Sequence, residues 1–430
     1  MSERKRIFLC LAHMSESGME QKYVKEAFDT NWVVPLGPNV NGFEQDLESY
    51  IYSNQEQKHT IAEGKKVCAL SSGTAAVHLG LIDIGVRAGD EVICQSLTFC
   101  ASVNPVIYLG AKPIFIDSEL DSYNMDPDLV EYAIKDRIAK TGRPPKAIVL
   151  VHLYGMPAKI DRIIDIANRY DIPVMEDAAE AMGSMYNGQL CGTFGQYGVW
   201  SFNGNKIITT SGGGALICPN EESKRNAIFY ATQAKEPLPY YQHEVIGFNY
   251  RLSNICAGIG RGQMHVLSDH IAHHQHLHDM YVNAFKDNPN ILVQSAYSPN
   301  VKSNYWLSTI LLNPESRVVV DGKVSDVKSD NSAGGQPNDN VEQLRVYLDK
   351  CGIETRPLWK PMHCMPVYGC YQSPLSKGCQ VSVVESKNCC SYVNGNSEIL
   401  FHQGLCLPSG PCVTDEDTHY IADCINNVIQ

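Results

Sequence analysis

The chain has 430 residues, of which 44% are hydrophobic and 19% are charged, and its formal net charge is −12. This composition predicts a soluble globular protein that is long enough for two domains. The acidic balance excludes a general polyanion binder, so we expect no nucleic-acid partner. No apolar run approaches the roughly 20 residues that cross a bilayer, so we expect no membrane partner.

The N-terminal apolar stretch, Ile7 to Ala12, is shorter than the apolar part of a secretory signal. The sixteen cysteines are scattered through apolar segments without a CxxC pair, and the adjacent Cys389 and Cys390 cannot easily pair with each other. In a chain without an export signal, reduced core thiols are the simplest interpretation. We therefore predict a cytoplasmic protein without a structural zinc or any other metal.

The first half of the chain alternates between strand and helix patterns. A helical pattern over 17–52 is interrupted by the rigid loop V-P-L-G-P-N-V. Buried strands are then predicted at 66–70, 90–95, 113–117, 147–152 and 172–176, most of them followed by a helical stretch. This alternation predicts an α/β fold whose mostly parallel sheet is covered by helices on both faces.

After a helical stretch that reaches Phe285, short strands and a helix over 341–350 predict a smaller α+β domain. We place the large domain, including an N-terminal arm, at 1–260, and the linking helix with the small domain at 261–430. An insert at 315–340, rich in Gly, Ser, Asp and Asn from 321, should be a mobile surface loop. For the histidines of the linking helix, a solvated helix face is favoured over a surface metal site: His265, His270, His273, His274, His276 and His278.

Two junctions between a strand and a helix are candidate ligand contacts. Ser71-Ser72-Gly73-Thr74 opens a helix, where free N–H groups and the helix dipole favour an anion, although a simple cap would account for Ser72. Phe99 lies at a second junction, where open α/β sheets place their ligands. Its ring could stack on a flat cofactor, and ordinary core packing explains it equally well.

Two charged residues favour Schiff-base chemistry. Asp177 ends a buried strand among alanines, and a buried carboxylate normally has a partner, such as a protonated pyridine nitrogen. Lys206 follows the strand-like run that ends at Phe202 and precedes T-T-S-G-G-G. A lysine held near a fixed point in a mostly uncharged neighbourhood can act as an amine nucleophile. An isolated lysine of this kind would more often be a surface residue of a hairpin.

Five motifs in this order resemble the DegT/DnrJ/EryC1/StrS family of pyridoxal-phosphate-dependent nucleotide-sugar aminotransferases: S-S-G-T, T-F-x-A-S, E-D-A-A-E-A, S-F-x-x-x-K-x-x-T-T and G-F-N-Y-R. The resemblance runs from about residue 7 to the C-terminus and is interrupted by the insert. It implies the fold-type I aminotransferase fold with a mostly parallel, seven-stranded sheet. It also implies a homodimer with active sites at the subunit interface, and pyridoxal 5'-phosphate as cofactor with pyridoxamine phosphate as intermediate.

The resemblance also implies roles for single residues. Lys206 corresponds to the lysine that binds the cofactor covalently, Asp177 to the partner of the ring nitrogen, and Phe99 to the residue stacked on the ring. Glu180 stands near the phenolic oxygen, where the family often has glutamine, and Asn249 would reach the phosphate from the neighbouring subunit. The remaining phosphate ligands implied are Gly73, Thr74 and Ser201.

The segments E-T-R-P-L-W-K-P-M-H and G-P-N-V-N-G-F-E are similar to those of members that aminate C4 of UDP-4-keto-6-deoxy-GlcNAc, with an amino acid such as L-glutamate as donor. Trp32, Lys360 and His363 are the substrate contacts that we expect. GDP-linked (perosamine-type) and dTDP-linked keto sugars are alternatives. Dehydratase relatives carry histidine in place of the lysine, so Lys206 opposes that activity, and the intact S-S-G-T loop opposes a non-catalytic regulator.

Overall fold

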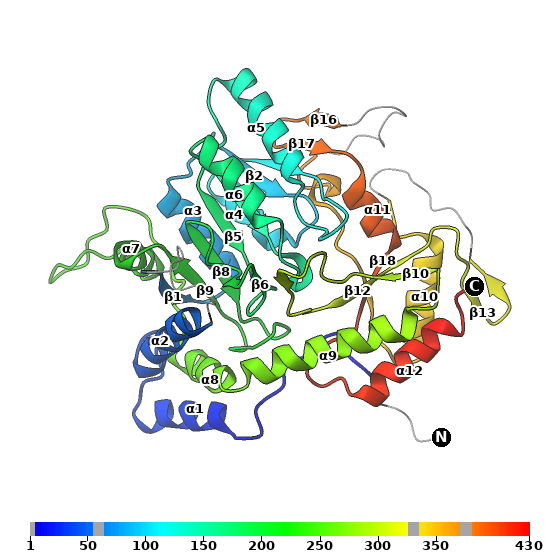
Figure 1. The fold of residues 1–430 in the computed structure, drawn as a ribbon. Coiled ribbons are helices and arrows are strands. Elements are labelled where there is room, and N and C mark those ends of the chain that lie inside the picture. The colour runs from blue at the N-terminus through cyan, green and yellow to red at the C-terminus, as the bar shows by residue number, and fades with distance from the viewer. Residues whose placement is uncertain (1–4, 55–63, 326–334, 370–380) are drawn as a thin grey trace.

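The computed structural model describes residues 5–54, 64–325, 335–369 and 381–430. Its central layer is a nine-stranded sheet (Figure 1). In spatial order the strands are β1 (Lys66–Leu70), β9 (Gly214–Cys218), β8 (Tyr197–Ser201), β5 (Val174–Asp177), β4 (Ala147–Val151), β2 (Glu91–Gln95), β3 (Lys112–Ile116), β17 (Cys390–Val393) and β16 (Ser382–Glu385). The five neighbouring pairs from β8 to β17 are parallel, which confirms the predicted α/β class.

The predicted number of seven strands is wrong, because β17 and β16 extend the sheet beyond β3. Cys390 is in register with Ile114 and Tyr392 with Ile116, and all four residues of β17 are buried. A pairing between segments so far apart in sequence depends on tertiary packing and not on local pattern. Residues of the predicted small domain thus complete the large sheet, and the boundary between 260 and 261 stays a prediction.

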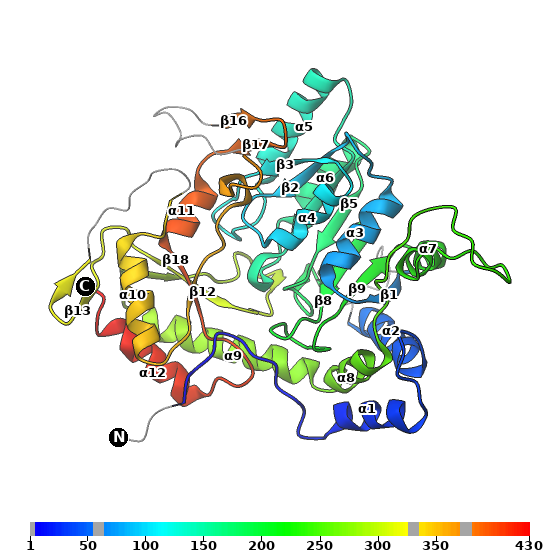
Figure 2. The same cartoon turned by 180° about the vertical axis from the view of Figure 1, so that it is seen from behind.

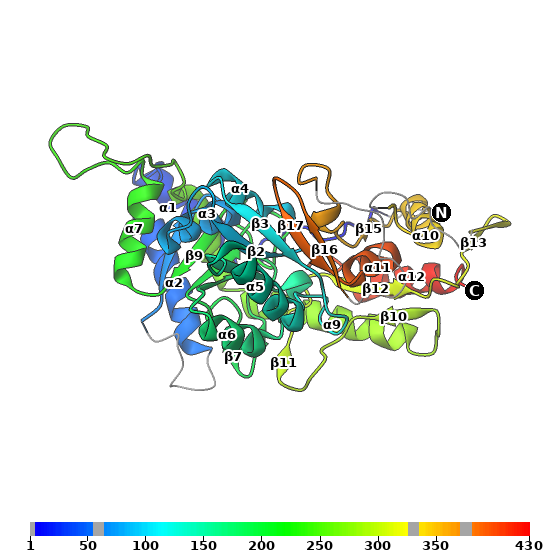
Figure 3. The ribbon, with the colours of Figure 1, turned by 90° about the horizontal axis from the view of Figure 1, so that it is seen from above.

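Helices cover both faces of this sheet (Figures 2 and 3). One face packs against α3 (Gly73–Ile84), α4 (Asn104–Tyr108) and α7 (Glu221–Ala231), and the other packs against α5 (Pro127–Thr141) and α6 (Ile160–Arg169). In β4, Val149 belongs to the first core, whereas Ile148 and Leu150 belong to the second. Burial on both faces explains why these strands read as continuous apolar runs.

A second, four-stranded sheet lies beside the first, and its strands run in the order β10 (Ile291–Val293), β12 (Ser308–Leu312), β18 (Gly404–Leu407) and β15 (Arg356–Pro357). Buried side chains of α9 (Leu267–Phe285), α10 (Asp339–Lys350) and α12 (Asp415–Asn426) share a core with it. At the other end of the molecule, α1 (Met19–Asp29) and α2 (Pro38–Ser53) pack against α8 (Asn254–Met264) (Figure 1).

Several shorter elements complete the described chain, namely β6 (Met185–Tyr186), β7 (Gln189–Leu190), β11 (Val301–Lys302), β13 (Val319–Val320), β14 (Lys323–Val324), α11 (Asn396–Gln403) and the short 3-10 helices Cys100–Ser102, Leu153–Gly155 and Met362–Cys364. The predicted surface loop at 315–340 contains the β13–β14 hairpin and the first two residues of α10. Its residues 326–334 lie outside the described part of the chain. No helix among the described residues is both long and apolar enough to cross a bilayer.

The predicted solvated face of histidines on α9 is wrong for three of them. His270, His274 and His278 are buried. The His270 ring donates a hydrogen bond to the carbonyl of Ile207 (2.9 Å) and the His274 ring donates to that of Tyr305 (3.2 Å). The His278 ring stacks on Tyr305 with centroids 3.5 Å apart. Backbone carbonyls from distant segments therefore accept from two of these rings, and helical spacing alone does not reveal such contacts.

The expectation that the cysteines are reduced is met only in part. Thirteen cysteines of the described chain are free, including Cys390. Cys389 is disulfide-bonded, so the expectation of reduced thiols throughout is wrong at this position. Its neighbour is free, so the two adjacent cysteines do not pair with each other, as expected.

Burial of the α9 histidines predicts a pH-dependent stability. Burial lowers the pKa of His274 to about 3 and that of His278 to about 4, whereas the unfolded rings titrate near 6.5. Below that value the unfolded chain binds more protons, so the free energy of unfolding should fall by about 1.4 kcal/mol per ring and pH unit. Urea unfolding at about pH 7 and about pH 5.5 measures this loss. A His274→Gln/His278→Gln variant that shows the wild-type pH dependence would contradict it.

Candidate active site

Four strands of the large sheet end at the wall of one cavity with a volume of about 280 Å³. Its lining includes Ser71, which directly follows β1, Val151 at the end of β4, Asp177 at the end of β5 and Ser201 at the end of β8. The carboxyl edge of a parallel sheet is where open α/β folds bind their ligands. The order and direction of these strands therefore determine where the cavity lies, independently of the side chains that line it.

Lys206 reaches this cavity from the turn that follows β8. Its main-chain N–H donates to the carbonyl of Asn203 (3.0 Å), which fixes the turn. Its Nζ lies 3.3 Å from Oε1 of Glu180 and 3.8 Å from the ring centroid of Trp306, and the side chain is only 13% exposed. The amine is thus held between a carboxylate and an aromatic face, as the predicted Schiff-base chemistry requires.

Asp177 also lines the cavity and is oriented by two donors. Ser102 Oγ donates to its Oδ2 (2.7 Å), and the backbone N–H of Ala179 donates to its Oδ1 (3.1 Å). Two fixed hydrogen bonds leave lone pairs of the carboxylate for a cationic partner in the cavity. A protonated ring nitrogen is a partner of this kind.

Glu180 is buried behind Lys206. The backbone N–H of Tyr154 donates to its Oε2 (2.7 Å), and burial raises the pKa of this carboxyl although the Lys206 amine opposes the shift. The neutral carboxyl is therefore accessible at higher pH than for an exposed glutamate. A neutral carboxyl can donate a hydrogen bond, as the amide of a glutamine does, so a glutamate can serve beside a phenolic oxygen.

The opposite end of the cavity is formed by the start of α3. Ser72 is the N-cap and its Oγ accepts from the N–H of Ala75 (3.0 Å), while Gly73 and Thr74 form the first turn. N–H groups of a first helical turn have no partner within the helix, which makes this end suited to a phosphate. A Cβ at Gly73 would stand 3.3 Å from Cβ of Ser201, so a glycine keeps the two walls close.

Phe99 lies on the cavity wall with 55% of its surface exposed, and its ring is 6.1 Å from that of Trp359. The ordinary alternative, core packing, does not fit a side chain so exposed. A flat ligand ring can therefore reach it. Trp359 is held in turn by its backbone N–H, which donates to the hydroxyl of Tyr154 (2.8 Å).

The predicted substrate contacts and Asn249 do not line this cavity. Trp32 is 39% exposed and lies elsewhere, and Lys360 donates to the carbonyl of Gly335 (3.2 Å). His363 is buried at 3% exposure. Asn249 is exposed on the surface, where a neighbouring subunit could reach it. The roles of these residues stay predictions.

His363 belongs to the one group of described residues whose ligand atoms could hold a metal ion, together with Cys364 and Glu398. Its Nδ1 lies 2.6 Å from Ser96 Oγ, and its Nε2 lies 3.3 Å from Glu398 Oε1. Both ring nitrogens thus already have hydrogen-bond partners. Ser96, His363, Cys364 and Glu398 thus form a hydrogen-bonded group of side chains.

Sequence reasoning missed three side chains that line or support the cavity. Ser102 orients Asp177, and Trp306 and Trp359 form aromatic walls. Trp359 stands in the R-P-L-W-K-P segment, where the two flanking prolines are a sequence signal for a rigid loop. Trp306 lies one hundred residues after Lys206, and no local pattern connects the two.

A reactive amine, an acid for a ring nitrogen and a phosphate site at a helix N-terminus are the three features that pyridoxal phosphate requires. The cavity at the carboxyl edge of the mostly parallel sheet brings together the amine of Lys206, the carboxylate of Asp177 and the first turn of α3. The fold and the site together define a pyridoxal-phosphate-dependent enzyme of fold-type I.

Comparison with known proteins agrees with this class. A model of the DegT/DnrJ/EryC1/StrS aminotransferase family matches residues 15–426, and the chain belongs to this family. It is 41% identical over 413 residues to the "Putative pyridoxal phosphate-dependent aminotransferase EpsN" of Bacillus subtilis (strain 168), which covers 96% of this chain and 93% of that protein. GDP-perosamine synthase of Escherichia coli O157:H7 is 34% identical, over 96% of each chain.

A solved structure of a DegT DnrJ EryC1 StrS aminotransferase from Brucella abortus has a TM-score of 0.77 and 25% identity, over 96% of this chain and 95% of that one. The protein is accordingly a pyridoxal-phosphate-dependent sugar aminotransferase.

The environment of Glu180 predicts how it tolerates substitution. Glu180→Gln should keep kcat within about tenfold of wild type, because the amide can still donate, whereas Glu180→Ala should lose about 10²-fold. As pH rises through its raised pKa, the wild-type carboxyl loses its proton and can no longer donate. With rising pH, kcat of Glu180→Gln should therefore decline less than that of wild type. Parallel pH profiles would show that a neutral Glu180 is not needed.

Proposed function

We propose that this enzyme transfers an amino group from an amino acid, L-glutamate, to the C4 ketone of a UDP-4-keto-6-deoxy-GlcNAc-type sugar nucleotide. The observation that carries the reaction type is the convergence of Lys206, Asp177 and Glu180 on one cavity, with Lys206 Nζ 3.3 Å from Glu180. When bound, pyridoxal phosphate supplies an aldehyde that combines with amines and a ring that delocalises the electron pair of a carbanion.

The residues of the cavity have distinct tasks in this proposal. Lys206 would hold the cofactor through Nζ, and the carboxylate of Asp177 would keep the ring nitrogen protonated. Glu180 would contact the phenolic oxygen, and Phe99 would cover one face of the ring. The phosphate would be bound by Gly73, Thr74 and Ser201.

Lys206 also moves the proton on which the reaction depends. With the cofactor and amino donor bound, the neutral Nζ of Lys206 would be placed to accept a proton from the donor's α-carbon as general base and to return it as general acid. In the second half of the cycle the same amine works in reverse on the carbon that bore the sugar ketone. The walls formed by Trp306 and Trp359 limit the access of water to Nζ during these transfers.

The choice of sugar is supported by sequence similarity. The segment from Glu354 to His363 and the one from Gly37 to Glu44 resemble members that act on the UDP-linked 4-keto sugar. The similarity to GDP-perosamine synthase supports a GDP-linked 4-keto sugar as the second candidate.

A homodimer completes the proposal. The segment between α7 and α8 projects from the body of the molecule (Figure 1, green loop at the left) and exposes Tyr240, Tyr241 and Ile246 at 62%, 82% and 85%. Exposed apolar groups of this size favour a protein interface. Among the described residues that line the cavity, Lys206 is the single cation, although a sugar nucleotide carries two phosphates. A second subunit, including Asn249, would supply further contacts to these anions.

Removal of the lysine tests the site. Lys206→Ala should abolish the visible absorbance of the bound cofactor and reduce kcat at least about 10⁴-fold, because both the covalent attachment and the proton carrier are lost. A Lys224→Ala variant, which removes a lysine paired with Glu44 outside the cavity, serves as the control. If the Lys206→Ala protein kept the visible absorbance, another lysine would hold the cofactor.

The substrate is tested separately. The enzyme is converted to its pyridoxamine form with L-glutamate and then offered UDP-, GDP- and dTDP-linked 4-keto sugars. The UDP-linked 4-keto-6-deoxy-GlcNAc should restore the pyridoxal absorbance at least about tenfold faster than the others, since a correctly contacted substrate gains about 1.4 kcal/mol or more in its transition state. A response to the GDP- or dTDP-linked sugars alone would refute the sugar and leave the reaction type intact.

A further inference from the structure

The segment Ser303–Trp306 precedes β12 of the second sheet and reaches the cavity from there. Trp306 is 2% exposed, and its indole Nε1 donates to the carbonyl of Asn205 (2.6 Å), the residue directly before Lys206. The face of the same ring lies 3.8 Å from Lys206 Nζ. One side chain thus contacts both the main chain that carries the lysine and its amine.

Asn304 connects Trp306 to the segment that carries Glu180. Its side-chain Oδ1 accepts from the N–H of Trp306 (2.9 Å), and its Nδ2 donates to the carbonyls of Glu180 (3.0 Å) and Met182 (2.9 Å). Asn304 is fully buried, and a Cβ at Gly155 would stand only 1.9 Å from its Oδ1. The position of the amide is therefore enforced by packing as well as by hydrogen bonds.

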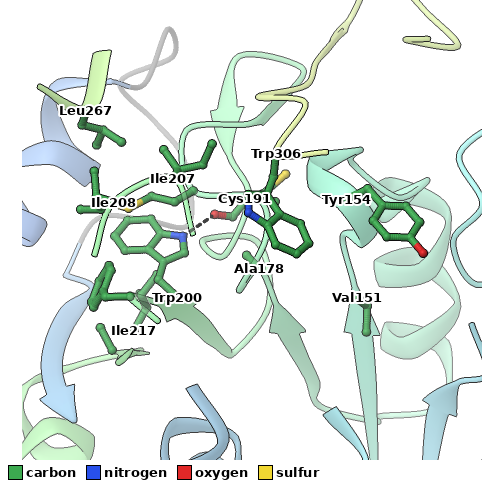
Figure 4. Close-up of a cluster of buried hydrophobic side chains, with 14 of the residues drawn as sticks. Val151, Tyr154, Ala178, Cys191, Trp200, Ile207, Ile208, Ile217, Leu267 and Trp306 are labelled. Carbon is green, nitrogen blue, oxygen red and sulfur yellow. Dashed lines mark hydrogen bonds between the residues drawn. The ribbon is translucent and has the colours of Figure 1, made fainter. Parts of the chain in front are cut away.

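Helix α9 forms hydrogen bonds with both the segment that carries Lys206 and the segment that carries Trp306. His270 bonds to the carbonyl of Ile207, the residue after Lys206, and His274 bonds to that of Tyr305, the residue before Trp306. Neither Lys206 nor Trp306 can shift without breaking a hydrogen bond in a buried region. Figure 4 shows Trp306 and Ile207 within the same group of buried side chains.

We infer that Trp306, held by Asn304, is a positioning residue that sets the place of Lys206 Nζ relative to Glu180. The indole N–H fixes the turn, and the ring face favours the amine in its cationic form. The inference rests on the proposed role of Lys206. An amine that must reach first one carbon and then another loses rate steeply when it is displaced by about 1 Å.

The test compares two substitutions with a matched control. Trp306→Phe keeps a ring beside Nζ and removes the N–H, and Trp306→Leu removes both. Trp200→Phe is the control, because Trp200 is also fully buried in this cluster and donates to the carbonyl of Cys191 (3.3 Å), yet it does not line the cavity (Figure 4). We expect kcat to fall about tenfold for Trp306→Phe and about 10²-fold for Trp306→Leu, with KM for glutamate changed less than about threefold. Trp200→Phe should leave kcat within about twofold.

Two further readouts separate positioning from loss of structure. The pH midpoint of the visible absorbance of the bound cofactor should drop by about half a unit or more in Trp306→Leu, where the cationic form loses the aromatic face. It should drop less in Trp306→Phe, whose ring is a weaker cation–π partner than indole, and should not move in Trp200→Phe. Borohydride reduction followed by peptide mass spectrometry should locate the cofactor on Lys206 in all four proteins.

Modification of another lysine in the wild type would refute the role of Lys206 itself and not only the positioning role of Trp306. An unchanged midpoint and kcat in Trp306→Leu, or an equal shift in Trp200→Phe, would overturn the positioning role while the role of Lys206 stands. If Trp306→Leu does not fold, Trp306→Phe decides by the same criteria.

Discussion

The ion pair between Lys206 and Glu180 is the interaction on which the rest of this site depends. A carboxylate with 6% of its side chain exposed and an amine with 13% exposed cannot be buried without compensating contacts. The protein supplies these contacts from several directions, including the N–H of Tyr154 and the face of Trp306. Residues far apart in sequence must therefore come into contact before the amine of Lys206 and the carboxylate of Glu180 can both be buried.

The sheet makes this meeting possible. Because β4, β5 and β8 are parallel neighbours, their last residues arrive at the same edge, and the turn after β8 brings Lys206 to Asp177 and Glu180. The second sheet then contributes from the opposite side through Ser303–Trp306. Segments from both sheets thus line the cavity, although its charged groups come only from segments of the nine-stranded sheet.

The sequence allowed the strands from β1 to β5 and the residues at their carboxyl ends to be predicted, because a buried parallel strand is a continuous apolar run and the following turn is polar. Lys206, Asp177, Gly73 and Phe99 were found in this way. Trp306 was not, since its contact with Lys206 bridges one hundred residues and follows from packing alone. The buried histidines of α9 were misjudged for the same physical reason, because their partners, such as the carbonyls of Ile207 and Tyr305, belong to other segments of the chain.

The pairing of β17 with the edge of β3 has a consequence for how the chain folds while it is synthesised on the ribosome. Ile114 and Cys390 are neighbours in the sheet, so this edge stays open until β17 has been synthesised. Pairings between such distant segments form slowly, and an open strand edge invites other chains to pair with it. The nascent protein should hence need protection along β3 until β17 pairs with it and covers this edge.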